Sequence, residues 1–80
     1  MKMTKPTFFF SQNCPVCLTV MKELKKEKID LNKRCKVVDC DTKSGSKIAR
    51  ENKIKFVPTL ITENKKYEGE DVICGLRGKC

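Results

Sequence analysis

The sequence predicts one α/β domain over residues 1–80, in which a minimal βαβαββα order forms a four-stranded mixed sheet flanked by helices. Three observations support this fold class. Eighty residues can bury only one small core. Short β-prone runs alternate with segments of helical periodicity. A hairpin pattern follows the second helical segment, and hairpins make antiparallel neighbours whereas βαβ crossovers make parallel ones, so the sheet is expected to be mixed.

The first strand and the first helix have clear boundaries. Thr7 to Phe10 is an aromatic, β-prone run between a proline and three polar residues, which suits a buried strand that ends in a loop. Pro15 fits a first helical turn, because its missing N–H has no intrahelical partner to lose, and this places Cys14 at the helix N-terminus. Apolar residues then recur at helical spacing, at Cys17, Val20, Met21 and Leu24.

The second half of the chain continues the alternation. Residues 35–40 are typical of a short strand, and turn and capping residues then precede a helix around residues 47–52. Residues 56–62 are strongly β-prone, and a turn leads to a returning strand at residues 66–68. Residues 71–78 fit a last short helix with an acid at its start. We therefore expect helices on both faces of the sheet.

The chain is strongly basic, although a lysine excess alone names no partner. The chain has 18 Lys and Arg residues against 10 Asp and Glu, a formal net charge of +8, which would attract acidic proteins, anionic peptides or nucleic acid. The lysine-rich run 22–28 is interrupted by Glu23 and Glu27 and contains no aromatic residue, so we expect a solvated helix face there. Nucleic acid is therefore not an expected partner.

The cysteine count is informative once the compartment is considered. The first residues, MKMTKPTFFFSQN, contain three successive apolar residues, too short a run for a signal-peptide core or a membrane span. We expect a cytoplasmic protein with no membrane partner. In a reducing cytosol, six cysteines favour catalytic or metal-binding thiols over a disulfide scaffold.

The motif Cys14-Pro15-Val16-Cys17 places two thiols at the start of a helix. Unpaired backbone N–H groups and the helix dipole stabilise a thiolate on Cys14, the candidate nucleophile. Cys17, one turn further along and on the apolar face, is the candidate resolving thiol. Zinc knuckles and iron–sulfur sites use the same spacing, so the motif alone leaves metal binding open.

A proline interrupts the strongest β-prone run, in Val57-Pro58-Thr59. Proline conflicts with a central ladder position unless it starts the strand beside a functional loop. Since most X-Pro bonds in folded proteins are trans, these residues alone favour an ordinary trans proline at a strand start.

Taken together, FFFSQNCPVC, VVDCD, ARENKIKFVPTLI and YEGED resemble the thioredoxin superfamily, most closely its small glutaredoxin-like and mini-thioredoxin members, over nearly the whole chain. The resemblance implies a thioredoxin fold and thiol-disulfide oxidoreductase activity, with Cys14 as nucleophile, Cys17 as resolving thiol and a cis Pro58 against them. It also implies a substrate-binding surface in which the Val57 backbone pairs with an extended substrate. That surface would comprise Pro15, Val16, Val57, Pro58 and Thr59.

The chain departs from both branches of that superfamily. Thioredoxins carry a buried acid six residues before the first cysteine, and this chain has Phe8 there. Glutaredoxins hold glutathione with a Gly-Gly-x-Asp segment and a lysine three residues before the first cysteine. The first glycine is replaced by Glu68, and the lysine by Ser11. The resemblance leaves four candidate glutathione-binding residues: Ser11, Gly69, Glu70 and Asp71.

The expected function is therefore the reduction of protein disulfides, as part of electron transport and cell redox homeostasis. The alternative is a glutathione-dependent glutaredoxin, and a third hypothesis is a Cys-ligated zinc or iron–sulfur module. We expect no tightly bound cofactor, with glutathione as one candidate reductant. The expected partners of this monomer are disulfide-containing proteins and, as electron donor, either a thioredoxin-reductase-like enzyme or glutathione.

The remaining cysteines suggest little chemistry. Cys40 is expected to be a small buried residue, with a second thiol near the active site as the alternative. A zinc site would need Cys35 and Cys40 in addition to the CPVC pair, but their spacing inside a strand is poor for a zinc knuckle. No metal ligands are therefore assigned, and the sequence gives Cys74 and Cys80 no clear role.

Overall fold

The computed structural model describes residues 6–63 and 65–77. Its elements, in chain order, are β1 (Thr7–Phe10), α1 (Pro15–Lys26), α2 (Leu31–Arg34), β2 (Lys36–Asp39), α3 (Lys43–Glu51), β3 (Thr59–Ile61), β4 (Lys66–Glu68) and α4 (Asp71–Arg77). The strands form one sheet in the order β2-β1-β3-β4. β1 pairs with β2 in parallel, whereas β1 with β3 and β3 with β4 pair antiparallel. The predicted four-stranded mixed sheet is thus confirmed.

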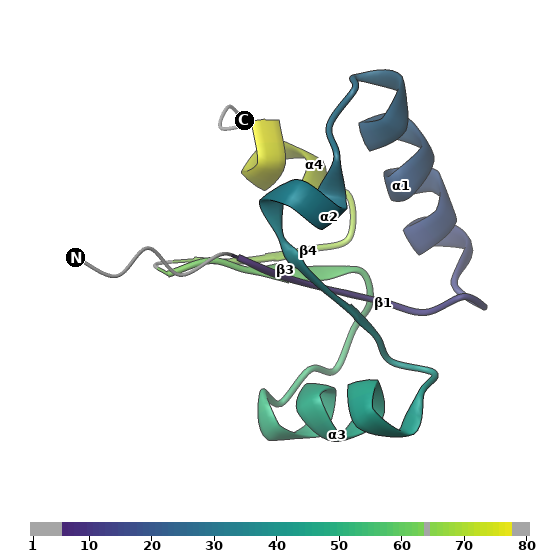
Figure 1. The fold of residues 1–80 in the computed structure, drawn as a ribbon, viewed down its shortest axis with the longest axis vertical. Helices are drawn as coiled ribbons and strands as arrows, with labels where there is room; N and C mark the ends of the chain where they lie inside the picture. Colours follow the sequence, from purple (N-terminus) through teal and green to yellow (C-terminus); the bar gives the residue numbers. More distant parts are fainter. Residues whose placement is uncertain (1–5, 64, 78–80) are drawn as a thin grey trace.

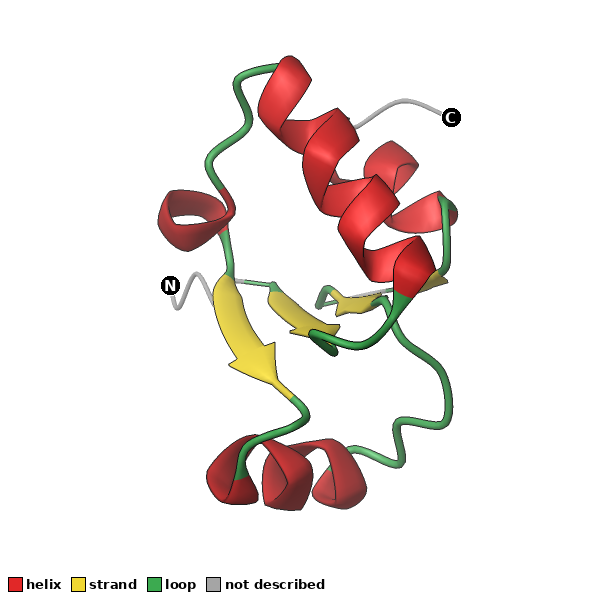
Figure 2. Ribbon diagram, turned by 90° about the vertical axis from the view of Figure 1, so that its right-hand side faces the viewer, coloured by secondary structure: helices red, strands yellow, loops and turns green. Residues whose placement is uncertain are grey.

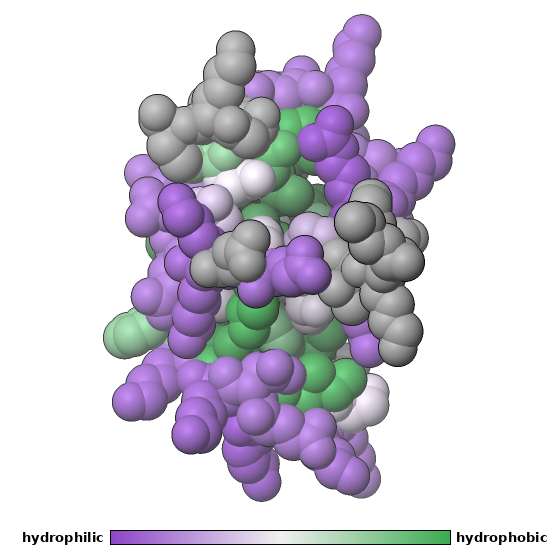
Figure 3. Space-filling view, turned by 90° about the vertical axis from the view of Figure 1, so that its left-hand side faces the viewer, coloured by the Kyte–Doolittle hydropathy of each residue, from purple (hydrophilic) through white to green (hydrophobic). Residues whose placement is uncertain are grey.

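Helices cover both faces of this sheet. Figure 1 shows the sheet nearly edge-on, with α1, α2 and α4 on one side and α3 alone on the other. The view turned by 90° shows the same separation, with α3 below the strands (Figure 2). Hydrophilic side chains cover the α3 end of the face drawn in Figure 3, and hydrophobic residues lie between that end and the upper helices.

Each face of the sheet has its own core. Phe8 and Phe9 are both fully buried, and they point to opposite faces because successive strand side chains alternate. Phe8 packs with residues of α1, β3 and α4: Val20, Leu24, Leu60, Val72 and Leu76. Phe9 packs with Val38 and Ala49 on the α3 side. Burying each phenylalanine contributes about 1.5–3 kcal/mol, so β1 anchors both layers.

One helix was missed by the sequence prediction, and another begins earlier than predicted. The short helix α2 was not predicted; Asp30 caps it by accepting a hydrogen bond from the Asn32 backbone N–H at 3.0 Å. The element order is therefore βααβαββα. Helix α3 begins at Lys43 rather than near Lys47, because Thr42 caps it by accepting from the Gly45 N–H at 2.9 Å.

The third strand is shorter than predicted. It covers residues 59–61, so residues 56–58 form a loop in front of it rather than part of the ladder. The last helix ends at Arg77, and the predicted end at residue 78 lies outside the described residues. Within the described part of the chain, no helix is long and apolar enough to cross a membrane.

Candidate active site

Cys14 is the N-cap residue of α1. Its sulfur accepts a hydrogen bond from the Cys17 backbone N–H at 3.1 Å, and its carbonyl oxygen accepts from the Leu18 N–H at 3.1 Å. Pro15 occupies the first helical position, as predicted. Cys14 is half-buried, and a backbone amide points at its sulfur.

The loop before β3 lies against this sulfur. The Val57–Pro58 peptide bond is cis, in agreement with what the family resemblance implies. The Cys14 thiol lies 3.5 Å from the Val57 carbonyl oxygen and donates a hydrogen bond to it. Pro58 and Thr59 are buried beneath, where the Thr59 hydroxyl donates to the Phe56 carbonyl oxygen. The predicted juxtaposition of Cys14 with the Val57–Pro58 segment is therefore present.

Cys17 is completely buried on the inner face of α1. The pKa of its thiol is raised from 9.0 to about 12, chiefly by burial and then by its hydrogen bond with Cys14, while the hydrogen bond with the Ser11 backbone acts in the opposite direction. Phe8, where thioredoxins have an acid, lies fully buried in the apolar core and offers no proton acceptor. Cys17 therefore keeps its proton at neutral pH.

Apolar side chains are exposed close to Cys14 in the sequence or beside the proline loop. Val16, Leu18 and Phe56 have exposed fractions of 44%, 57% and 64%. Val16 and Leu18 belong to the first turns of α1, and Phe56 immediately precedes Val57. Exposed apolar side chains around a reactive group are typical of a surface that binds another molecule. Val16 was predicted as a substrate contact, whereas Leu18 and Phe56 were not.

The loop that precedes Cys14 is tied to the end of β2 by a hydrogen-bond network that the sequence did not predict. The Asp41 carboxylate accepts from the Ser11 hydroxyl at 3.0 Å and from the Gln12 backbone N–H at 2.9 Å. The Gln12 side-chain amide donates to Asp39 at 2.6 Å. Asp39 and Asp41 therefore hold in place the loop that presents Cys14.

Cys40 lies between these two acids and is half-buried. Burial and then the negative charges of Asp39 and Asp41 raise the pKa of its thiol. A charge on Cys40 is also one of the factors that raise the pKa of Cys17, so the two thiols are within electrostatic reach of each other. Cys40 is thus less buried than expected, and its role as a second thiol near the site stays a prediction.

The cysteines of the zinc hypothesis do not converge. Cys35 is buried in the core with Phe8 and Leu24, directly before β2, whereas Cys40 directly follows it. The whole of β2 separates the two. Among the described residues, no group of three or more Cys, Asp or Glu side chains is placed to hold a metal ion. Cys80 lies outside the described residues.

The four candidate glutathione-binding residues make different kinds of contact in the structure. Ser11 is engaged by Asp41, and the Gly69 N–H donates to the Pro58 carbonyl oxygen at 2.8 Å. Glu70 and Asp71 line a groove of about 460 Å³ between α1 and α4, together with Thr19, Glu23, Ile73 and Cys74. This groove thus carries three carboxylates, although the chain as a whole is basic.

Comparisons with known proteins inform the fold and nothing further. The chain matches no protein-family model, and it matches no curated protein. It is similar to a solved structure described as the structure of a malarial protein, with 21% sequence identity, a TM-score of 0.58 and coverage of 96% of each chain. At this identity the similarity concerns the fold alone, and it extends over almost the whole α/β chain.

Proposed function

We propose that this chain is a small thiol-disulfide oxidoreductase of the thioredoxin fold, which reduces protein disulfides through the Cys14–Cys17 dithiol. The observation that supports this most is the meeting of Cys14 with the Val57–Pro58 loop: a thiol at a helix N-terminus, 3.5 Å from the carbonyl of a residue before a cis proline. A structural staple or metal knuckle has no need of a peptide segment with a cis proline beside the sulfur.

The proposed reaction has two exchange steps. The Cys14 thiolate attacks one sulfur of the substrate disulfide, which forms a mixed disulfide and releases the other sulfur as a thiolate. Cys17 then gives its proton to the substrate thiolate released in the first step, and its sulfur attacks the Cys14 sulfur, closes the Cys14–Cys17 bond and releases the second substrate thiolate. Two electrons pass from the dithiol to the substrate, and the protons lost by the two cysteines balance those taken up by the product thiols.

The substrate would lie across the proline loop. Val57 is half-buried and precedes the strand β3, so its backbone is placed to pair with an extended peptide as an added strand does. The exposed side chains of Val16 and Phe56 would contact the residues on either side of the substrate disulfide. Pro15 is also exposed, and the buried Thr59 supports the loop from below.

Protein disulfides fit this site better than glutathione. Glutathione carries two carboxylates, and the groove that contains the candidate glutathione-binding residues Glu70 and Asp71 carries a third carboxylate, that of Glu23. One of these, Glu23, lies 3.7 Å from the Lys26 ammonium, but that pair is exposed and screened. Like charges disfavour an anionic ligand there. We therefore place a protein substrate first, with glutathione as the competing reductant or substrate.

The electron donor in this proposal is a thioredoxin-reductase-like enzyme, with glutathione as the alternative. Such a cycle needs a reducing compartment, for which the cytoplasm is the natural setting. The proposal requires neither a metal nor an organic cofactor within the chain, and it works with a monomer.

The test uses dithiothreitol as electron donor, so the identity of the natural reductase does not matter. Reduction of a protein disulfide is followed for the wild type, for Cys14→Ser and Cys17→Ser, and for Cys74→Ser as a matched control. We expect activity in the wild type and in Cys74→Ser and its loss in the other two. Equal activity in all four proteins would refute the proposal. A parallel assay with NADPH, run once with thioredoxin reductase and once with glutathione and its reductase, identifies the donor.

A further inference from the structure

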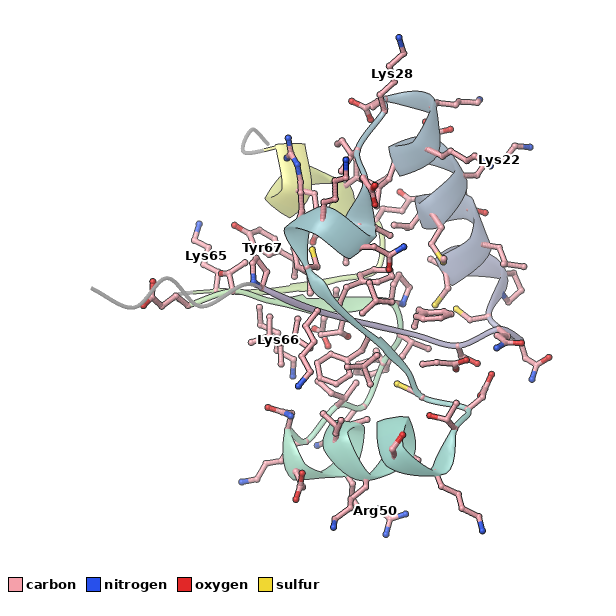
Figure 4. All side chains as sticks on the ribbon, in the orientation of Figure 1. Lys22, Lys28, Arg50, Lys65, Lys66 and Tyr67 are labelled. Carbon is pink, nitrogen blue, oxygen red and sulfur yellow. The ribbon has the colours of Figure 1, made fainter. Side chains whose placement is uncertain are left out.

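A second groove, of about 720 Å³, runs along the outer side of α3. Its walls carry three cations, two hydroxyl groups and one thiol: Lys43, Lys47, Arg50, Thr42, Ser46 and Cys40. Figure 4 shows Arg50 pointing away from the sheet, on the layer opposite to Lys22 of α1. The proposed reaction uses none of these cations.

The three cations follow the helix in a line. Lys43, Lys47 and Arg50 are spaced i, i+4 and i+7, which places them on one face of α3. At about 1.5 Å of rise per residue, the line is about 10 Å long before side-chain reach is added. Within the described residues, none of the three has a carboxylate within salt-bridge distance. Their charge is therefore available to a ligand.

The linear arrangement of the three cations suits a row of carboxylates better than a single phosphate. A phosphate site at a helix start uses free backbone N–H groups, and the Thr42 hydroxyl already takes one of them, the Gly45 N–H. Asp41 also lines the groove at that end and would repel a small dianion. In an extended peptide, alternate side chains on one face lie about 7 Å apart. The cations are about 5 Å apart along the helix axis, and their long, flexible side chains can reach such a row of carboxylates.

Nucleic acid is a poorer match. Single strands bind through base stacking on aromatic side chains as well as through charge. None of the residues that line the groove is aromatic. The groove therefore offers charge and hydrogen-bond donors, which an acidic peptide can use in full.

From these observations we propose that the α3 groove, lined by Lys43, Lys47 and Arg50, is a docking site for an acidic, extended segment of a protein partner. This goes beyond the disulfide exchange proposed above and does not depend on it. The groove ends at Cys40 and Asp41, and Asp41 holds Ser11 and Gln12 of the loop that precedes Cys14. A partner docked on α3 would therefore reach the candidate active site.

The test measures binding of a fluorescent peptide in which Glu alternates with Ser, by anisotropy at low salt on the reduced protein. The docking variant is Lys43→Glu with Lys47→Glu and Arg50→Glu. The matched control reverses three exposed lysines of the opposite layer, by the substitutions Lys22→Glu, Lys25→Glu and Lys33→Glu. Both variants undergo the same change in net charge.

We expect the docking variant to bind the peptide roughly tenfold more weakly or worse, since three exposed ion pairs become three repulsions, and the control to lose roughly twofold or less. Equal losses in the two variants would mean that only the net charge attracts the peptide, and would overturn the proposal. So would an oligothymidylate of equal charge that binds more tightly through the same three residues, because nucleic acid would then be the occupant.

Two further measurements separate a loss of docking from a loss of folding and locate the bound peptide. If the charge reversals unfold the protein, as judged by circular dichroism, the Gln versions of the same three substitutions replace them and should weaken binding in the same order. The peptide should also slow alkylation of Cys40, which lines the groove, but not of Cys74, which lies in the other groove. Equal protection of both thiols, or of neither, would contradict docking on α3. The Cys14→Ser variant should bind as the wild type does, so a failure of docking and a failure of disulfide exchange are separate results.

Discussion

The Cys14 thiol donates a hydrogen bond to the Val57 carbonyl oxygen, across 43 positions of sequence. The contact joins the N-terminus of α1 to the loop that leads into β3, and these two segments are neighbours because β1 and β3 pair directly in the sheet. The same loop is held from the other side by the Gly69 N–H, which donates to the Pro58 carbonyl. The Cys14 thiol therefore faces a peptide segment that is held by hydrogen bonds from both sides.

The variants Cys17→Ser and Cys14→Ser should behave in opposite ways when a mixed disulfide with the substrate is trapped. In Cys17→Ser the proposed mixed disulfide on Cys14 cannot be resolved, so it should accumulate with an oxidised protein substrate and be visible by intact mass and on non-reducing gels. In Cys14→Ser no such adduct should form, because Cys17 is completely buried. Cys74→Ser should behave as the wild type. Adducts that form as readily on Cys14→Ser would reverse the assigned roles.

The buried thiol of Cys17 should make the stability of the reduced protein fall at high pH. Its pKa is raised from 9.0 to about 12, chiefly by burial, so the folded state holds the proton more tightly than the unfolded chain. The contribution to stability is fully present below pH 9 and is lost as the pH rises towards 12. The slope from this group is at most about 1.4 kcal/mol per pH unit.

The measurement for this prediction is urea unfolding of the reduced protein at several pH values between 8 and about 10.5, for the wild type and for Cys17→Ala. Lysine and tyrosine titrations are common to both proteins, so they cancel in the difference. The stability gap between the two should narrow as the pH rises. A gap that stays constant would mean that the folded protein does not hold the Cys17 proton.

Local sequence patterns predicted much of this fold because local chemistry decides those parts. Pro15 at the first helical position and the apolar period from Cys17 to Leu24 specify α1 within one segment, and three apolar residues in succession specify β1. The hairpin of β3 and β4 is likewise a short-range event. Cys14 could be placed at the helix start for the same reason.

The missed features depend on smaller or more distant signals. Helix α2 has a single turn, which is too short to show a period, and its only mark in the sequence is the cap residue Asp30. The start of α3 depends on Thr42, which is one of several adjacent residues that could cap a helix. The hydrogen bond between Ser11 and Asp41 spans 30 positions, and neither residue type predicts that the other is its partner. Such tertiary polar contacts become visible only when β1 and β2 are seen to lie side by side.

Removing the Asp41 carboxylate should reduce activity through the loop that it holds. Asp41→Ala loses the bonds from Ser11 and Gln12, at a cost of about 1–3 kcal/mol, and frees the residues before Cys14. Asp30→Ala is the matched control, since Asp30 also accepts from a backbone N–H and its loss costs about 1 kcal/mol, but it lies on α2, away from the loop. Disulfide reduction should fall in Asp41→Ala and remain in Asp30→Ala.

A conservative variant separates the charge of Asp41 from its hydrogen bonds. Asp41→Asn keeps an acceptor for Ser11 and Gln12, so activity should return towards that of the wild type. It removes one of the charges that raise the pKa of Cys40, so Cys40 should be alkylated faster at pH 8 than in the wild type. If Asp41→Asn is as inactive as Asp41→Ala, disulfide reduction depends on the charge of Asp41 rather than on the loop geometry. If Asp30→Ala loses equal activity, the effect is one of general stability.

Gly45 should tolerate no side chain, although it lies within a helix. A Cβ atom at this position would lie 1.8 Å from the Asp39 carbonyl oxygen, which belongs to the backbone and cannot turn aside. In an exposed helix, a Gly→Ala substitution raises the stability of the folded state by up to about 1 kcal/mol. Here the clash should instead destabilise the protein by about 1–3 kcal/mol or more, as overpacking does. Ser44→Ala, at the neighbouring exposed position, should change stability by less than about 0.5 kcal/mol.

Urea unfolding of the two variants distinguishes them, and a Gly45→Ala protein as stable as the wild type would mean that α3 does not approach Asp39 this closely. Because Asp39 and Asp41 hold the loop before Cys14, a displaced α3 should also lower disulfide reduction, so stability and activity should fall together in Gly45→Ala.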